Sequence, residues 1–208
     1  MSDLTKELLR KLVHLTELPI IAGYSFLHFY FSPKIGILSL TALLLILLEI
    51  EYFRVDYQTK LMVRLTELFS KFVLRQHEKN NITGAIFFVI STIIAFSAFD
   101  YPIALAALLM TVFGDLVSAI IGTAFGKRKI FRRKSYAGTL SGLLTNIIIG
   151  MILLPEYPEV FIPMAFIASI VEMFTQKLDD NLTVPVFAGF IGQMIVFWEK
   201  IALPPLFL

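Results

Sequence analysis

Two acidic residues interrupt long apolar stretches of the sequence, where an ionisable side chain is costly. Asp115 lies inside the segment 101–125, and Glu172 lies inside the segment 159–178. Asp115 shares one helical stripe with small or polar residues, which are Thr111, Ser118 and Gly122. A carboxylate in such a stripe suits two tasks: ligation of a divalent cation, or acceptance of a proton from a hydroxyl group. The alternative is a buried acid satisfied by neighbouring polar side chains such as Asn146.

A basic segment follows the Asp115 stretch. Residues 126–138 contain six cations, and they end in a Ser, a Tyr and two small residues. Point charges combined with the backbone N–H groups of a helix N-terminus suit a chain of phosphates. Lys127 is followed by Arg rather than Ser or Thr, so a Walker-type loop is excluded. The alternatives are a positive signal for membrane topology and a patch for anionic lipids.

A second acidic group stands between the last two apolar segments. It consists of Asp179, Asp180 and Asn181, and Glu172 precedes Asp179 by seven residues, which predicts one shared helical face. Carboxylate and amide oxygens are the ligands that Mg²⁺ prefers, so this group is a candidate metal site. The alternative is a capping turn in which Asp180 or Asn181 is the N-cap of the last helix.

The N-terminal segment has a polar face at helical spacing, opposite a face of leucines. The polar residues are Glu7, Arg10, Lys11 and His14. An interfacial anchor with snorkelling cations explains the same pattern. Two further charged groups, around Glu51 and Glu78, mark the ends of the second and third apolar segments.

Apolar helices are the elements that must position these groups. The 208 residues are 57% hydrophobic and 16% charged, which excludes an ordinary soluble domain. We expect an all-α fold, a polytopic integral membrane helical bundle of about seven transmembrane helices. The expected spans are residues 13–31, 35–53, 82–99, 101–125, 138–154, 159–178 and 182–207.

The charges in the connections predict the orientation of the bundle. Of the 18 Lys and Arg residues, all except Lys34 and Lys200 fall on the side of the N-terminus. The N-terminus is therefore expected to be cytoplasmic. The polar groups then lie at one membrane face, where folding can bring them to a single site. A net charge of +2 gives no reason to expect a nucleic-acid partner.

Five stretches of the chain resemble, in order, the polyprenol kinase family, which includes dolichol kinase, phytol kinase and the CTP-dependent diacylglycerol kinases. They are residues 7–14, 78–84, 113–127, 134–142 and 179–185. The resemblance implies a single transmembrane lipid-kinase domain over 1–208, with a basic nucleotide-binding loop at 126–138. It also implies transfer of the γ-phosphate of CTP, with Mg²⁺ or Mn²⁺, to a membrane lipid alcohol at the cytoplasmic face, with dolichol or another polyprenol preferred.

The resemblance and the residue patterns together predict roles for individual residues. The predicted catalytic residues are Asp115, which matches a family motif, and His14, Lys11 and Arg10 of the first helix. The predicted nucleotide-binding residues are Lys127, Lys134, Ser135, Gly138, Gly122 and Gly126. The predicted metal ligands are Asp115, Asp179, Asp180 and Asn181, and the supporting residues are Glu7, Glu78 and Glu172.

Several alternatives stay open. Diacylglycerol, phytol or geranylgeraniol would suit the same apolar surroundings as dolichol. A lipid-phosphate cytidylyltransferase would use the same nucleotide and metal but release pyrophosphate. An ion-coupled transporter would use the intramembrane acids as an ion path, although the polar residues gather at one face instead of the midplane. Small-residue spacing at Gly122 to Gly126 and Gly138 to Gly142 suits close helix packing within or between chains, so a homo-oligomer is open.

Overall fold

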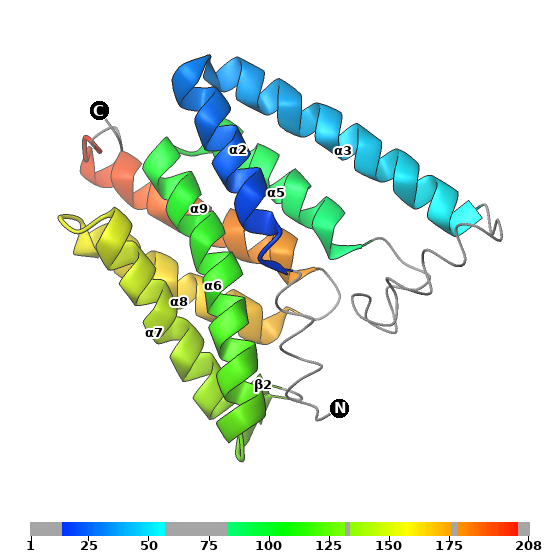
Figure 1. Ribbon diagram of the computed structural model, residues 1–208. Helices are drawn as coiled ribbons and strands as arrows, with labels where there is room; N and C mark the ends of the chain where they lie inside the picture. The colour runs from blue at the N-terminus through cyan, green and yellow to red at the C-terminus, as the bar shows by residue number, and fades with distance from the viewer. Residues whose placement is uncertain (1–13, 57–82, 132–133, 176–178, 204–208) are drawn as a thin grey trace. The chain divides into compact units, whose positions relative to one another are not determined.

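The computed structural model describes residues 14–56, 83–131, 134–175 and 179–203. The chain divides into two compact units, residues 1–90 and 91–208, which are described one at a time. Helices account for nearly all of the regular structure in the described residues (Figure 1). The expectation of an all-α fold is therefore confirmed at the level of fold class.

The first unit contains two helices that pack against each other, α2 (Glu17–Tyr30) and α3 (Pro33–Asp56). They approach closely at Gly36, where a Cβ atom would lie 2.7 Å from the ring of Tyr24. Tyr24 is buried in this contact, whereas α3 exposes large apolar side chains such as Leu38 and Leu45. Helix α5 (Gly84–Ala98) begins in this unit and ends in the second.

The second unit is built around α6 (Tyr101–Phe125). Helix α6 packs against α7 (Tyr136–Leu153), α8 (Pro158–Phe174) and α9 (Asp180–Glu199), and α7 lies beside it in Figure 1. The helices share an apolar core because each presents small and aliphatic side chains inward. Core residues include Ile103 and Met110 of α6, Met164 of α8, and Ala188 of α9.

A short antiparallel hairpin joins α6 to α7. Its strands are β1 (Lys129–Phe131) and β2 (Lys134–Ser135), with Lys129 opposite Ser135 and an irregularity in the register before Phe131. The sequence predicted a loop here and no strand. The hairpin forms because the backbone groups of two short strands satisfy each other between two helix ends.

Each expected apolar segment coincides with a helix, but several boundaries differ. The expected segment 101–125 matches α6, whereas the expected 182–207 ends at Glu199 because Lys200 adopts a left-handed conformation, with φ of 54°. The expected 159–178 ends as a helix at Phe174. Four helices of the described residues are long and apolar enough to cross a membrane, namely α3, α6, α7 and α9. Seven spans and a cytoplasmic N-terminus stay predictions.

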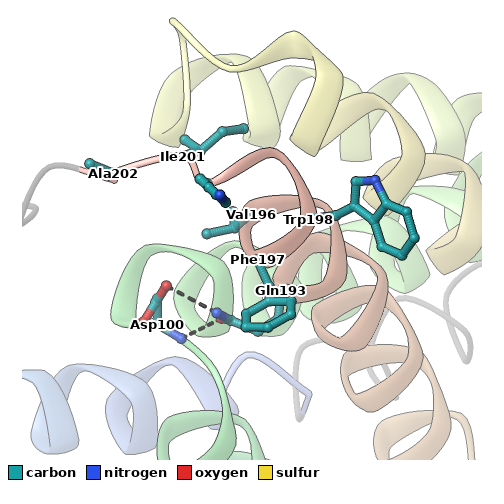
Figure 2. A pocket seen from close by; sticks show the side chains of 8 residues that line it. Asp100, Gln193, Val196, Phe197, Trp198, Ile201 and Ala202 are labelled. Carbon is teal, nitrogen blue, oxygen red and sulfur yellow. Dashed lines mark hydrogen bonds between the residues drawn. The ribbon is translucent and has the colours of Figure 1, made fainter.

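The start of α6 borders a hollow of about 580 Å³ that the C-terminal end of α9 also lines. Figure 2 shows Asp100 and Gln193 at its edge, joined by two hydrogen bonds. Trp198 is strongly exposed beside it. Because none of the lining residues belongs to the predicted site, the candidate chemistry lies elsewhere in this unit.

Candidate active site

Helix α6 carries the central acid. Asp115 and Ser118 are buried, with 8% and 4% of their surfaces exposed, and Thr111 on the same stripe is buried as well. The predicted stripe therefore faces the interior of the helical unit, as its spacing indicated. Gly122 continues the stripe toward the hairpin, so the acid lies between the apolar core and the basic segment.

The described cations of the basic segment divide into outward and inward ones. Lys127, Arg128 and Lys129 are exposed, whereas Lys134 is 33% exposed and its side chain enters the helical unit. The paired strands fix this difference, because β2 leads directly into α7 and holds Lys134 next to the helix start. A single basic run in the sequence thus becomes two kinds of cation in the structure.

Glu172 of α8 binds Lys134, the inward cation. Lys134 Nζ donates to Glu172 Oε1 at 2.5 Å, and Ser118 Oγ donates to the same oxygen at 2.7 Å. Burying a carboxylate is costly unless it is paired and hydrogen-bonded, and here both conditions are met. The bonds join α6, α8 and the hairpin at one point.

The charge of Lys134 is favoured by more than one carboxylate. Burial alone would lower the pKa of this lysine, but the Glu172 carboxylate and two further acids outweigh burial, and the pKa is raised above its ordinary value. The two further acids are Asp115 and Asp180. Carboxylates from α6, α8 and α9 therefore act on one ammonium group.

Asp179 has a structural task. Its side-chain Oδ1 accepts a hydrogen bond from the backbone N–H of Asn181 at 2.9 Å, so Asp179 is the N-cap of α9. The sequence had offered Asp180 or Asn181 as the cap. The predicted shared face of Glu172 and Asp179 is wrong, because α8 ends at Phe174 and Asp179 belongs to the start of another helix.

Asn181 is buried at the start of α9, with 3% of its surface exposed. Its backbone oxygen accepts a hydrogen bond from Ser91 Oγ at 2.7 Å. Among the residues that the structure describes, no three His, Asp or Glu side chains are grouped closely enough to hold a metal ion. The metal-ligand roles of Asp115, Asp179, Asp180 and Asn181 stay predictions.

The three predicted nucleotide-binding glycines lie at the crossing of α6 and α7. A Cβ atom on Gly138 would lie 2.7 Å from the backbone oxygen of Ser118 and 3.1 Å from the Cα of Gly122. Gly126 packs equally closely against Ser135. Ser135 caps α7, because its Oγ accepts the backbone N–H of Gly138 at 3.1 Å. The small-residue spacing is thus used for packing within the chain.

A second polar contact joins α7 and α8, about one helical turn before Glu172 on α8. Asn146 Nδ2 of α7 donates to Ser169 Oγ of α8 at 3.1 Å, and the Asn146 side-chain oxygen packs against Gly114. The sequence had named Asn146 as a neighbour that satisfies Asp115, but it had not identified Ser169. The signal was present in the spacing, since Ser169 precedes Glu172 by three residues and shares its helical face.

The predicted residues of the N-terminal half lie in the first unit or outside the described residues. His14 Nδ1 pairs with Glu17 Oε1 at 3.1 Å, and Glu51 Oε1 accepts the backbone N–H of Thr83 at 2.9 Å. The latter bond joins the ends of the second and third apolar segments. Four residues with predicted catalytic or supporting roles lie outside the described residues; they are Glu7, Arg10, Lys11 and Glu78.

Comparison with known proteins identifies relatives by sequence. The chain is 27% identical over 142 residues to CTP-dependent diacylglycerol kinase 1 of Schizosaccharomyces pombe, covering 60% of this chain and 65% of that protein. It is 25% identical over 158 residues to CTP-dependent diacylglycerol kinase 1 of Eremothecium gossypii, covering 62% and 49%. It is 30% identical over 123 residues to phytol kinase 1 of Arabidopsis thaliana, a chloroplastic protein, covering 50% and 40%.

The chain thus spans less than two thirds of the length of each of these relatives. No family model matches the chain. No solved structure matches it either. The apolar helices and the relatives together identify an integral membrane protein. All three relatives are members of the polyprenol kinase family, and the chain is related to the lipid kinases of that family, which its motifs resemble.

Proposed function

We propose that the protein is a CTP-dependent kinase that phosphorylates a membrane lipid alcohol. The observation that carries the proposal is the single ammonium group of Lys134, on which carboxylates of three helices act beside an exposed basic hairpin. Phosphoryl transfer needs this kind of arrangement, because the protein mainly neutralises charge and holds the reactants in line. The names of the relatives support CTP as the donor.

In the proposed reaction the hydroxyl oxygen of the lipid attacks the γ-phosphorus of CTP. The bond between that phosphorus and the β–γ bridging oxygen breaks, and CDP leaves with the bonding electrons. Asp115 accepts the hydroxyl proton, since it is the buried acid of α6 beside the ion pair. Lys134 and the exposed cations of the hairpin stabilise the charge of the phosphates.

Magnesium or manganese is part of the proposal as an ion that enters with the nucleotide. Acidic oxygens of Asp115 and Asp180 suit such an ion chemically. The described residues contain no ready-made group of three ligands, so we assign no step to the metal. When bound, a divalent cation would add positive charge at the phosphates.

For the acceptor, we favour diacylglycerol and phytol over dolichol, because these two alcohols are named in the relatives. The apolar faces of the helices suit the hydrocarbon part of either lipid. We place the site at the cytoplasmic face, because 16 of the 18 basic residues fall on the expected inner side.

The experiment that tests the proposal uses purified protein in detergent with γ-labelled CTP or ATP and Mg²⁺. Diacylglycerol, phytol, geranylgeraniol and dolichol are offered separately, and the label is followed into the lipid phase. We expect label from CTP in diacylglycerol or phytol, and transfer at least about 100-fold slower with the Asp115→Asn variant. Release of pyrophosphate with a lipid phosphate, without label in any alcohol, would replace the proposal by a cytidylyltransferase.

A further inference from the structure

We propose that Glu172 is a positioning residue that holds Lys134 at the phosphates of the donor nucleotide, and that Ser118 orients Glu172 for this task. The proposal deepens the proposed kinase function and rests on it. It assigns a role to an acid that touches neither the phosphates nor the lipid hydroxyl. Its basis is the chain of two hydrogen bonds that runs from α6 through α8 to the hairpin.

Both bonds end on one oxygen of Glu172. Ser118 Oγ lies 2.7 Å from Oε1, and Lys134 Nζ lies 2.5 Å from it. Ser118 and Glu172 are almost fully buried, so their side chains have few alternative partners and a defined orientation. A carboxylate fixed in this way defines the position of the ammonium group that binds it.

Gly142 of α7 makes room for this contact. A Cβ atom at Gly142 would lie 3.0 Å from the Cβ of Ser118 and 3.8 Å from Glu172 Oε2. A larger residue at this position would push against the side chain of Ser118. Because Gly142 has no side chain, α7 leaves room for α6 and α8 to meet beneath the hairpin.

The inward cation Lys134 differs from three other described cations of the basic segment in one respect that matters for phosphate binding. Lys127, Arg128 and Lys129 are exposed, so their long side chains sample many rotamers and bind an anion at an entropic cost. Lys134 is held by Glu172 before the nucleotide arrives. An ammonium group has three N–H donors, so the bond to Glu172 is compatible with further bonds to phosphate oxygens.

Two further acids act on the same ammonium group. Both Asp115 and Asp180 attract the Lys134 ammonium electrostatically and favour its charged form. The hydrogen bond from Lys134 Nζ to Glu172 Oε1 is the contact on which the positioning role rests.

The first test compares Glu172→Gln with Glu159→Gln, an exposed acid at the start of the same helix. A charge-assisted hydrogen bond contributes enough that its loss should raise the KM for CTP about 10-fold to 100-fold. Glu159→Gln should leave this KM unchanged. Ser118→Ala, which removes only the orienting bond, should raise it by about 3-fold to 10-fold. A wild-type KM in Glu172→Gln would overturn the proposal.

The second test separates positioning from simple stabilisation, and it uses the exchanged double variant Lys134→Glu with Glu172→Lys. The exchange restores an ion pair but anchors the ammonium on α8 in place of the hairpin. We expect thermal stability to return toward that of the wild type while the KM for CTP stays at least about 10-fold higher. If both the thermal stability and the KM for CTP returned to wild-type values, the pair of Lys134 and Glu172 would have only a structural role, and the proposal would be overturned.

Direct binding of CTP, measured by equilibrium dialysis, separates this proposal from the proposed function. If the wild type binds CTP but transfers no phosphate, the kinase proposal fails, and the affinity of Glu172→Gln still tests the positioning role. If the wild type does not bind CTP, both proposals are overturned. If the wild type transfers phosphate and Glu172→Gln binds CTP equally well, only the positioning role is overturned.

Discussion

The two ends of α6 both carry polar residues that bind another helix, but they treat charge in opposite ways. At the hairpin end, buried carboxylates share the ammonium group of Lys134. At the other end, the exposed Asp100 makes two hydrogen bonds with Gln193. Its side-chain Oδ2 accepts a hydrogen bond from Gln193 Nε2 at 3.1 Å, and its backbone N–H donates to Gln193 Oε1 at 2.7 Å. A buried charge is costly, whereas an exposed polar pair is not. The hairpin end is therefore the candidate functional site.

Among the residues that the structure describes, the core between these ends contains no comparable charge. Ile103, Met110 and Met164 are almost completely buried there, and the neighbouring helices contribute mainly small or aliphatic residues. The polar contacts begin around Gly114 and Asn146 and extend to the hairpin. This contrast supports the proposed site at the hairpin end of the second unit, and substitutions at matched positions can test it.

The largest effect is expected from removal of the charge of Asp115. Asp115→Asn should lower kcat by about 100-fold to 10,000-fold, because general base catalysis contributes rate factors of that size. Asp100→Asn at the opposite end should leave kcat within about twofold of the wild type. Initial rates of lipid phosphorylation measure both, and size-exclusion profiles in detergent check folding. Equal losses of kcat in the two variants would show that the two ends of α6 do not differ in their contribution to the reaction.

A smaller effect is expected from adding a methyl group where α6 and α7 cross. Gly138→Ala places a methyl group 2.7 Å from a backbone oxygen of α6, which cannot rotate away. We expect a loss of about 1–3 kcal/mol in the free energy of unfolding. At the other end, the methyl group of Gly192→Ala meets the flexible Sδ of Met164 at 2.5 Å, so the loss should stay below about 1 kcal/mol.

Thermal and denaturant unfolding in the same detergent measure these two losses. A third variant, Gly23→Ala, has open space around the added methyl group and serves as the control. A Gly192 variant that is less stable than the Gly138 variant would contradict the assignment of the more rigid contact to the hairpin end.

A still smaller effect is expected from breaking the exposed pair at the start of α6. Gln193→Ala removes both hydrogen bonds with Asp100. Because these groups are exposed and water can replace the bonds, the stability should fall by less than about 1 kcal/mol. Lipid phosphorylation should be unchanged. A large loss of activity would indicate that the hollow beside Gln193 takes part in the reaction.

The smallest effect is expected from pH in the neutral and mildly alkaline range. The pKa of Lys134 is raised above its reference value of 10.5, so the folded state favours the charged form. A raised lysine pKa contributes stability that is complete at neutral pH and is lost only as the pH rises through the raised value. The stability difference between the wild type and Lys134→Met should therefore stay constant from pH 7 to about 9.5. A difference that shrinks within this range would contradict the ion pair.

Much of the fold follows from local patterns. Apolar runs predicted helices at all seven places, and the bounds of α6 agree with the expected 101–125. Errors arose where a local conformation ends an apolar run, as at Lys200, or where short strands pair across a basic stretch, as in the hairpin. Neither event has a strong local signal, because the strands contain few residues and the left-handed residue is not a glycine.

The candidate site was only partly predictable for a related reason. The sequence singled out Asp115 and Glu172 because an acid in an apolar segment is unusual. It paired Glu172 with Asp179 by assuming one continuous helix, and the break after Phe174 made that pairing wrong. The roles of Lys127, Ser135 and the other nucleotide-binding residues stay predictions, as does the part assigned to His14.

The sequence by itself determined the class of the molecule: apolar helices interrupted by a few acids and one basic segment, with motifs that resemble those of a lipid kinase family. Composition and spacing carry that information because burial in lipid acts on each segment separately. Only the tertiary structure decided that Lys134 binds Glu172, 38 residues further along the chain. A hydrogen bond depends on distances of a few ångströms, and these arise only when three helices and the hairpin pack together.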